Sequence, residues 1–146
     1  MKNINVFINR KYEKLNKSLC KSIIEKILTF YNYTSYDVNL IFTSDIQLSD
    51  LKKEFFSKDQ WTDVITFPLQ IDSKFIEGEI YISLPTAKKN ANFFREPYEK
   101  ELVRLIIHGS LHLLGIEDKS KEQKKEMTLL EEKFLKDVSW RELIEK

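Results

Sequence analysis

Two histidines are present in the sequence, and both lie in the run HGSLHLLGIED at residues 108–118. His108 and His112 are one helical turn apart, so their imidazoles would point the same way and could bind one metal ion. Gly115 follows where such a helix could turn back, and Asp118 comes shortly after it. The pattern predicts a catalytic metal site formed by His108, His112 and Asp118, with one coordination position open for water.

A hydrogen-bonded core residue is the simpler interpretation of one histidine on an apolar helix. Two histidines at this spacing favour a metal, because burying both imidazoles without partners would cost stability and one ion satisfies both. We predict a single Zn²⁺, since imidazole nitrogen is a poor ligand for magnesium or calcium. Iron or manganese remain alternatives, because mixed histidine and carboxylate sites also bind them.

The residue after the first histidine argues against a zinc protease. The spacing is similar to the zinc-protease pattern HExxHxxGxxH, but Gly109 stands where those proteases carry a glutamate as general base. A metalloprotease is therefore the less favoured function.

Composition indicates an ordinary globular protein. The 146 residues are enough for one core, so we expect one domain over residues 1–146. Hydrophobic residues make up 42% and charged residues 32%, a balance that excludes a disordered chain. The formal charge is only +1, so any nucleic-acid surface would have to be a local basic patch.

The expected location is the cytoplasm. Cys20 is the sole cysteine and cannot form an internal disulfide, and the N-terminal residues lack the apolar core of a secretion signal. No apolar stretch approaches the length that spans a bilayer.

The elements that would position the metal site follow from hydrophobic spacing. Alternation predicts strands over residues 4–8, 38–42, 62–67 with Pro68 ending the strand, and from about Gly78 through Ile82. Helical spacing predicts helices over 15–30, 45–54 and 85–94. Two more are predicted, one that begins at Pro97 and carries ELVRLIIHGSLHLLG, and one from Lys121 through Met127 to Val138. The helix that carries the histidines is apolar on nearly every side, which predicts a central position.

Three segments together resemble a known family. HGSLHLLGIED resembles the HGxLHLxGxxH signature of the YbeY family, TDVITFP at 62–68 resembles its TDVLSFP segment, and GEIYIS at 78–83 resembles its GDIxIS strand. The three occur in the family's order and spacing and cover residues 50 to 135. The resemblance implies an α+β fold with a four-stranded mixed sheet, about five helices and a zincin-like metal site on the central helix.

The function that the resemblance implies is a zinc-dependent, single-strand-specific endoribonuclease. It would act in 16S rRNA 3′-end maturation and ribosome biogenesis, with precursor rRNA and the small ribosomal subunit as partners and neither DNA nor a membrane involved. A ribosome-assembly binding factor with a structural metal is the alternative.

The chain departs from the family at two positions. The family's usual third histidine falls on Asp118, whose oxygen can still coordinate zinc but would raise the pKa of a bound water. The family's arginine shortly before TDV falls on Phe56, and Lys58 or Arg95 are the candidate replacements.

Further candidates surround these motifs. A phosphate track could include Lys52, Lys53, Lys58, Lys88, Lys89 and Arg95, with Trp61 or Phe94 for base stacking, although a solvated lysine face is the simpler interpretation. Asp63 and Glu79 are candidates for orienting the histidines, and Glu117 is an available base. We assign no function to the lysines that follow Asp118, since they alternate with glutamates as on an exposed helix.

Overall fold

A computed structural model describes residues 1–56 and 63–145, with side chains described for all of these except residues 45 and 52–56. The elements in chain order are β1 (Lys2–Ile8), α1 (Lys17–Phe30), β2 (Ser35–Thr43), α2 (Asp45–Phe56), β3 (Val64–Ile71), β4 (Phe75–Ser83), α3 (Leu84–Phe94), α4 (Tyr98–Leu113), α5 (Lys121–Leu135) and the short 3₁₀ helix η1 (Trp140–Glu142). Within the described ranges, no helix combines the length and apolar character needed to cross a lipid bilayer.

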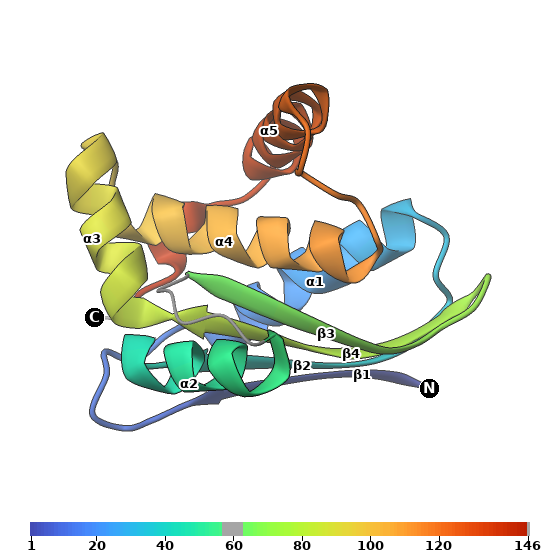
Figure 1. Ribbon diagram of the computed structural model, residues 1–146, viewed down its shortest axis with the longest axis horizontal. Coiled ribbons are helices and arrows are strands. Elements are labelled where there is room, and N and C mark those ends of the chain that lie inside the picture. The colour runs from blue at the N-terminus through green and yellow to red at the C-terminus, as the bar shows by residue number, and fades with distance from the viewer. Residues whose placement is uncertain (57–62, 146) are drawn as a thin grey trace.

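The strands form one mixed sheet in the order β1, β2, β4, β3. The pairs β1/β2 and β2/β4 are parallel, whereas β3 runs antiparallel to β4. Alternate residues of β2 and β4 are buried, which leaves one apolar face to be covered. Helices α1 and α4 lie along that face, and α5 packs beyond α4 (Figure 1). The predicted α+β fold with a mixed sheet and five helices is confirmed.

The edge strand β3 corrects one prediction. We expected Pro68 to end the strand, but β3 continues to Ile71 and Pro68 pairs with Gly78. A proline is tolerated here because β3 is at the edge of the sheet, where one side of the strand needs no ladder hydrogen bonds. The register shifts between Pro68 and Gln70, so the strand absorbs the proline as an irregularity.

Several other boundaries differ from the expected ones, including the start of β2 at Ser35. Strand β4 begins at Phe75, before Gly78, and α5 ends at Leu135, so Val138 lies beyond the helix. Thr62, the expected start of the third strand, lies outside the described residues.

Helix α4 is the central element, as its apolar sequence predicted. It contacts β3, β4, α1, α3, α5 and η1. Two glycines let it lie very close to the sheet. A Cβ atom at Gly109 would be 2.7 Å from Ile80 Cγ2, and one at Gly78 would be 2.5 Å from Leu113 Cδ1 and 2.8 Å from the carbonyl oxygen of Phe67.

The contact at Gly78 predicts a large effect of a single methyl group. Gly78→Ala should lower the free energy of unfolding by roughly 1–3 kcal/mol, because a backbone carbonyl and a buried leucine must both move. Urea denaturation measures the change. The control Glu77→Ala, with its side chain on the opposite face of the sheet, should change stability by under about 0.5 kcal/mol. Equal stability of Gly78→Ala and the native protein would contradict the close packing.

Candidate metal centre

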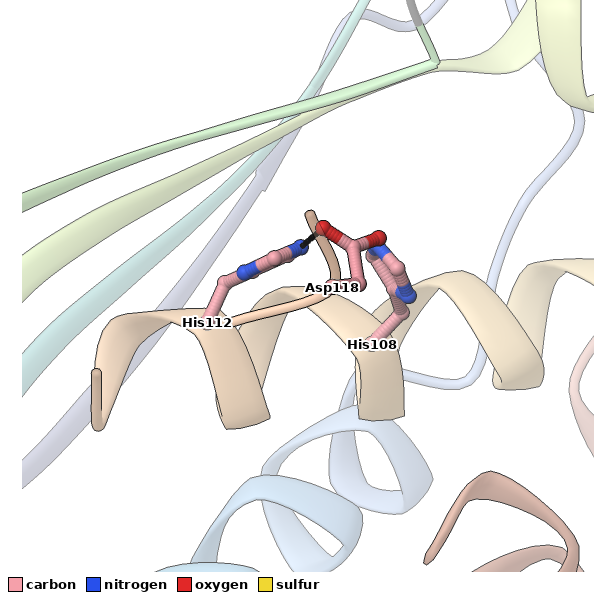
Figure 2. Close-up of side chains that lie close together, drawn as sticks. All are labelled: His108, His112 and Asp118. Carbon is pink, nitrogen blue, oxygen red and sulfur yellow. Dashed lines mark ion pairs between the residues drawn. The ribbon is translucent and has the colours of Figure 1, made fainter. Parts of the chain in front are cut away.

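The two histidines share one face of α4. His108 and His112 have about a quarter of their side chains exposed, and their ring centroids lie 4.5 Å apart at an interplanar angle of 81°. Both side chains rise from the same side of the helix toward Asp118 (Figure 2). The helical spacing therefore aligns the imidazoles as predicted.

Gly115 returns the chain so that Asp118 reaches the histidines. Its φ of 91° is left-handed, its N–H donates to the carbonyl of His112, and the N–H of Ile116 donates to the carbonyl of Leu111. These two bonds form a Schellman motif, which ends a helix and turns the chain back. The following loop then carries Asp118 over the last turn of α4.

The distances within this cluster suit a shared cation. Asp118 Oδ2 lies 3.6 Å from His108 Nε2, and Asp118 Oδ1 lies 3.3 Å from His112 Nε2. In tetrahedral coordination with ligand bonds of about 2.1 Å, two ligand atoms lie about 3.4 Å apart. One ligand atom from each of the three residues lies within 4.8 Å of the others. The three side chains could therefore hold one metal ion with little rearrangement.

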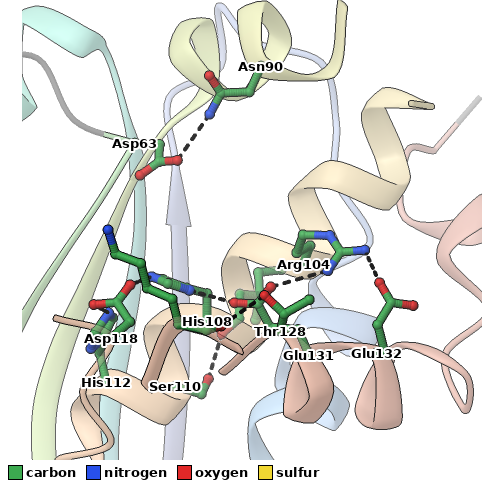
Figure 3. Close-up of polar contacts among 12 residues, drawn as sticks. Asp63, Asn90, Arg104, His108, Ser110, His112, Asp118, Thr128, Glu131 and Glu132 are labelled. Atoms are coloured by element: carbon green, nitrogen blue, oxygen red, sulfur yellow. Dashed lines mark hydrogen bonds and ion pairs between the residues drawn. The ribbon is translucent and has the colours of Figure 1, made fainter. Parts of the chain in front are cut away.

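Glu131 of α5 orients the first histidine. The Nδ1–H of His108 donates to Glu131 Oε2 at 2.6 Å, which leaves Nε2 directed at Asp118 (Figure 3). The other oxygen of Glu131 accepts from Arg104 at 3.1 Å. A carboxylate on the far nitrogen of a ligating histidine is the usual way to fix its tautomer and ring orientation.

The same surroundings affect the proton affinity of His108. Burial opposes protonation, but the hydrogen bond and charge of Glu131, with the charges of Asp118 and Asp63, outweigh it. The pKa of His108 is therefore raised above its usual value, which shows that the surroundings attract positive charge.

Comparison with known proteins shows the family to which the chain belongs. A family model described as "Endoribonuclease YbeY" matches residues 3–139. The chain belongs to the YbeY endoribonuclease family. A protein of that name from Persephonella marina is 33% identical, with 91% of this chain and 92% of the relative covered. Another from Phocaeicola vulgatus is 36% identical, with 80% and 83% covered.

A solved structure has a similar fold. The solution structure of a Thermotoga maritima protein matches with a TM-score of 0.65 and 30% identity, covering 95% of this chain and 92% of that one.

In the described part of the chain, the two residues expected to orient the histidines hydrogen-bond to other side chains. Asp63 accepts a hydrogen bond from Asn90 at 3.0 Å, and Glu79 accepts one from Tyr81 at 3.2 Å. Glu131 is the partner that the sequence reasoning missed. A signal was available, because Glu131 lies one helical turn from both Met127 and Phe134 on the buried stripe of α5, where a carboxylate requires a partner.

The candidate cations differ in whether they line the cavity beside the metal centre. Lys88 lies over the ring of Tyr98, and Arg95 is exposed at the end of α3. Arg104 and Lys124 instead line a cavity of about 630 Å³ beside His108 and Asp118. Arg104 is bound by Glu131 and Glu132, so it does not replace the family's arginine as a free phosphate ligand. Lys89 is exposed on α3. The side chains of the candidates Lys52, Lys53, Lys58 and Trp61, and of Phe56 at the position of the family's arginine, lie outside the described residues.

Glu117, the available base, lies in the loop just before Asp118. Its side chain is half exposed and pairs with Lys119 at 3.7 Å.

Glu101 is a second buried carboxylate beside the cavity. Its exposed fraction is 8%, and its neighbours include Asp63, Asn90 and Arg104. Burial, with repulsion from Asp63, raises the pKa of Glu101 to about 7 despite the opposing effects of Arg104 and the Asn90 hydrogen bond. The folded protein therefore keeps this carboxyl group protonated at pH values where the unfolded chain ionises it.

This difference predicts a pH-dependent stability. Because the folded-state pKa lies above the unfolded value, the stability that Glu101 contributes should be lost as the pH rises from 4.5 to about 7. Glu101→Gln mimics the protonated acid, so its stability relative to the native protein should increase over that interval by up to about 3 kcal/mol. Urea denaturation at each pH with EDTA present measures the difference.

A control for net charge is Glu126→Gln on the exposed surface of α5. Parallel stability curves for the native protein and Glu101→Gln between pH 4.5 and 7 would contradict the raised pKa.

Proposed function

We propose that this protein is a zinc-dependent endoribonuclease that cuts single-stranded RNA at the cluster of His108, His112 and Asp118. The observation that carries the proposal is the convergence of two imidazole nitrogens and one carboxylate in a chain of the YbeY endoribonuclease family. Zinc is the preferred ion because imidazole dominates the ligand set.

Each residue has a separate task in this proposal. His108 and His112 each present Nε2, and Asp118 presents its carboxylate oxygens opposite them. Glu131, held by Arg104, keeps the ring of His108 in the orientation that leaves Nε2 free. A bound Zn²⁺ would supply Lewis acidity toward water or a phosphate oxygen of the RNA.

The biological role that we propose is maturation of rRNA at the 3′ end of 16S rRNA, with the small ribosomal subunit as partner and the cytoplasm as location. Family membership supports this role.

Peptide hydrolysis has a geometric obstacle. A Cβ at position 109 would lie 2.7 Å from Ile80 Cγ2 and 3.2 Å from Val64 Cγ1, so the glutamate that zinc proteases carry after the first histidine has no room. A different position would have to supply the base for peptide cleavage.

Removing individual ligands tests the metal and the activity together. Asp118→Asn and His112→Ala should each lower zinc affinity at least about tenfold and abolish cleavage of single-stranded RNA, since each removes one of three ligands. Competition with a zinc chelator measures affinity, and gel analysis of labelled RNA measures cleavage.

The matched control is Glu117→Gln, which alters the exposed carboxylate next to Asp118 and should leave both quantities unchanged. Unchanged zinc affinity in Asp118→Asn would remove Asp118 from the ligand set. Full cleavage by folded His112→Ala would contradict the endoribonuclease mechanism. An assembly factor would be favoured if the native protein did not cleave RNA and His112→Ala still bound the small ribosomal subunit.

The role of Glu131 has its own test. Glu131→Gln should lower zinc affinity roughly 10–100-fold, because the amide is a poorer acceptor for the Nδ1–H of His108. Glu132→Gln is a close control, since Glu132 bonds to the same arginine without contacting His108. Equal zinc affinities of the two variants would show that Glu131 does not position His108.

A further inference from the structure

The cavity beside the metal centre extends away from the histidines toward α3. Its volume is about 630 Å³, within the range of about 300–1,000 Å³ that is usual for small organic ligands. His108 and Asp118 border it, and Asp63, Asn90 and Glu101 line it as well. Figure 3 shows Asp63 and Asn90 facing each other on the α3 side, with His108 and Arg104 on α4.

The charges on the α3 side of the cavity do not suit a phosphate group. Of the two cations among the described lining residues, Arg104 is bound by Glu131 and Glu132, and Lys124 is exposed on α5. The α3 side instead presents the carboxyl groups of Asp63 and Glu101. A ligand there needs to be neutral and to offer N–H donors.

Asn90 holds the carboxylate of Asp63 in place. Its Nδ2 donates to Asp63 Oδ2 at 3.0 Å. Among the described residues, Asp63 Oδ1 has no side-chain or backbone donor assigned to it. Asp63 therefore keeps acceptor capacity on the wall of the cavity.

An aromatic ring borders the same cavity. Phe94 lines it with 65% of the residue exposed, and it packs edge to face against Phe93, which is 81% exposed, with ring centroids 5.0 Å apart. The exposed ring could stack on the face of a nucleobase, and the acceptor oxygens of the neighbouring wall could bind the N–H groups on its edge.

We propose that this cavity is a nucleobase subsite that prefers guanine in the RNA strand bound at the metal centre. The preference follows from the base edges: guanine offers N1–H and its 2-amino group side by side, so one carboxylate can accept both. Uracil presents a single N–H between two carbonyl oxygens, which carboxylates repel. The proposal rests on the proposed endoribonuclease function and adds the base that the site selects.

A binding experiment tests the subsite without requiring cleavage. Fluorescence anisotropy with EDTA present compares labelled oligouridine RNA with the same RNA carrying one guanosine. The native protein should bind the guanosine RNA roughly tenfold more tightly, the discrimination typical of one bidentate contact. Replacing that guanosine by inosine, which lacks only the 2-amino group, should remove most of the preference.

Two variants assign the contact. Asp63→Asn can still accept the Asn90 bond but lacks the second carboxylate oxygen, so it should bind both RNAs with nearly equal affinity. Phe94→Ala should weaken binding of both RNAs and leave their ratio unchanged, because stacking tolerates any base. Asp137→Asn, which alters an exposed carboxylate far from the cavity lining, is the control and should retain the full preference.

The outcomes separate this proposal from the function on which it rests. Equal affinities of the native protein for the guanosine, inosine and uridine RNAs would overturn the subsite and leave the endoribonuclease intact. A guanosine preference that persists in Asp63→Asn would overturn the assigned contact. Binding of neither RNA by the metal-free protein would overturn the subsite, whereas the endoribonuclease is tested separately by cleavage in the presence of zinc.

Discussion

The close packing of α4 on β4 is the constraint on which the site depends. Gly109 and Gly78 let the helix lie where any larger residue would meet Ile80, Leu113 or the carbonyl of Phe67. Neighbouring elements surround the helix, so its rotation about its own axis is fixed by packing. The directions of His108 and His112 are therefore set by the core, before any ion is considered.

Two buried carboxyl groups beside the site are accommodated by different means. Glu131 is 7% exposed and lies within hydrogen-bonding distance of a guanidinium and an imidazole. Glu101 is 8% exposed, has a carboxylate as a neighbour, and remains protonated up to a pH of about 7. Burying a charged group costs free energy unless the group is paired. We therefore attribute these two carboxyl groups to orienting side chains and binding a ligand rather than to stabilising the fold. Both border the same cavity, where those roles are needed.

The sequence predicted the elements more fully than the contacts between them. Period-2 and helical spacing located the four strands and five helices, and the spacing of His108, His112 and Asp118 anticipated their convergence. Pro68 was misjudged because the strand order was unknown, and only an edge strand accepts it. Glu131 was missed because the spacing in α5 indicates only that this buried carboxylate needs a partner, and does not show that the partner is His108 on another helix.

The position of Asp118 follows from restraints on both sides of its loop. The Schellman motif at Gly115 fixes the start. At the other end, Ser120 and Gln123 form a capping box, and the side chain of Gln123 also accepts from the N–H of Lys119. Asp118 is thus held by the backbone on either side of it.

Having Asp118 as the third ligand affects how strongly the metal centre would attract a substrate phosphate. Two neutral imidazoles and a carboxylate leave an ion with one positive charge fewer than three imidazoles would, which weakens its pull on phosphate. Arg104 cannot compensate, because two glutamates bind it. Among the described cavity-lining cations this leaves Lys124, on the exposed face of α5. The lysine-rich start of α5, which sequence alone gave no reason to single out, therefore lies where a departure from three histidines makes a cation most useful.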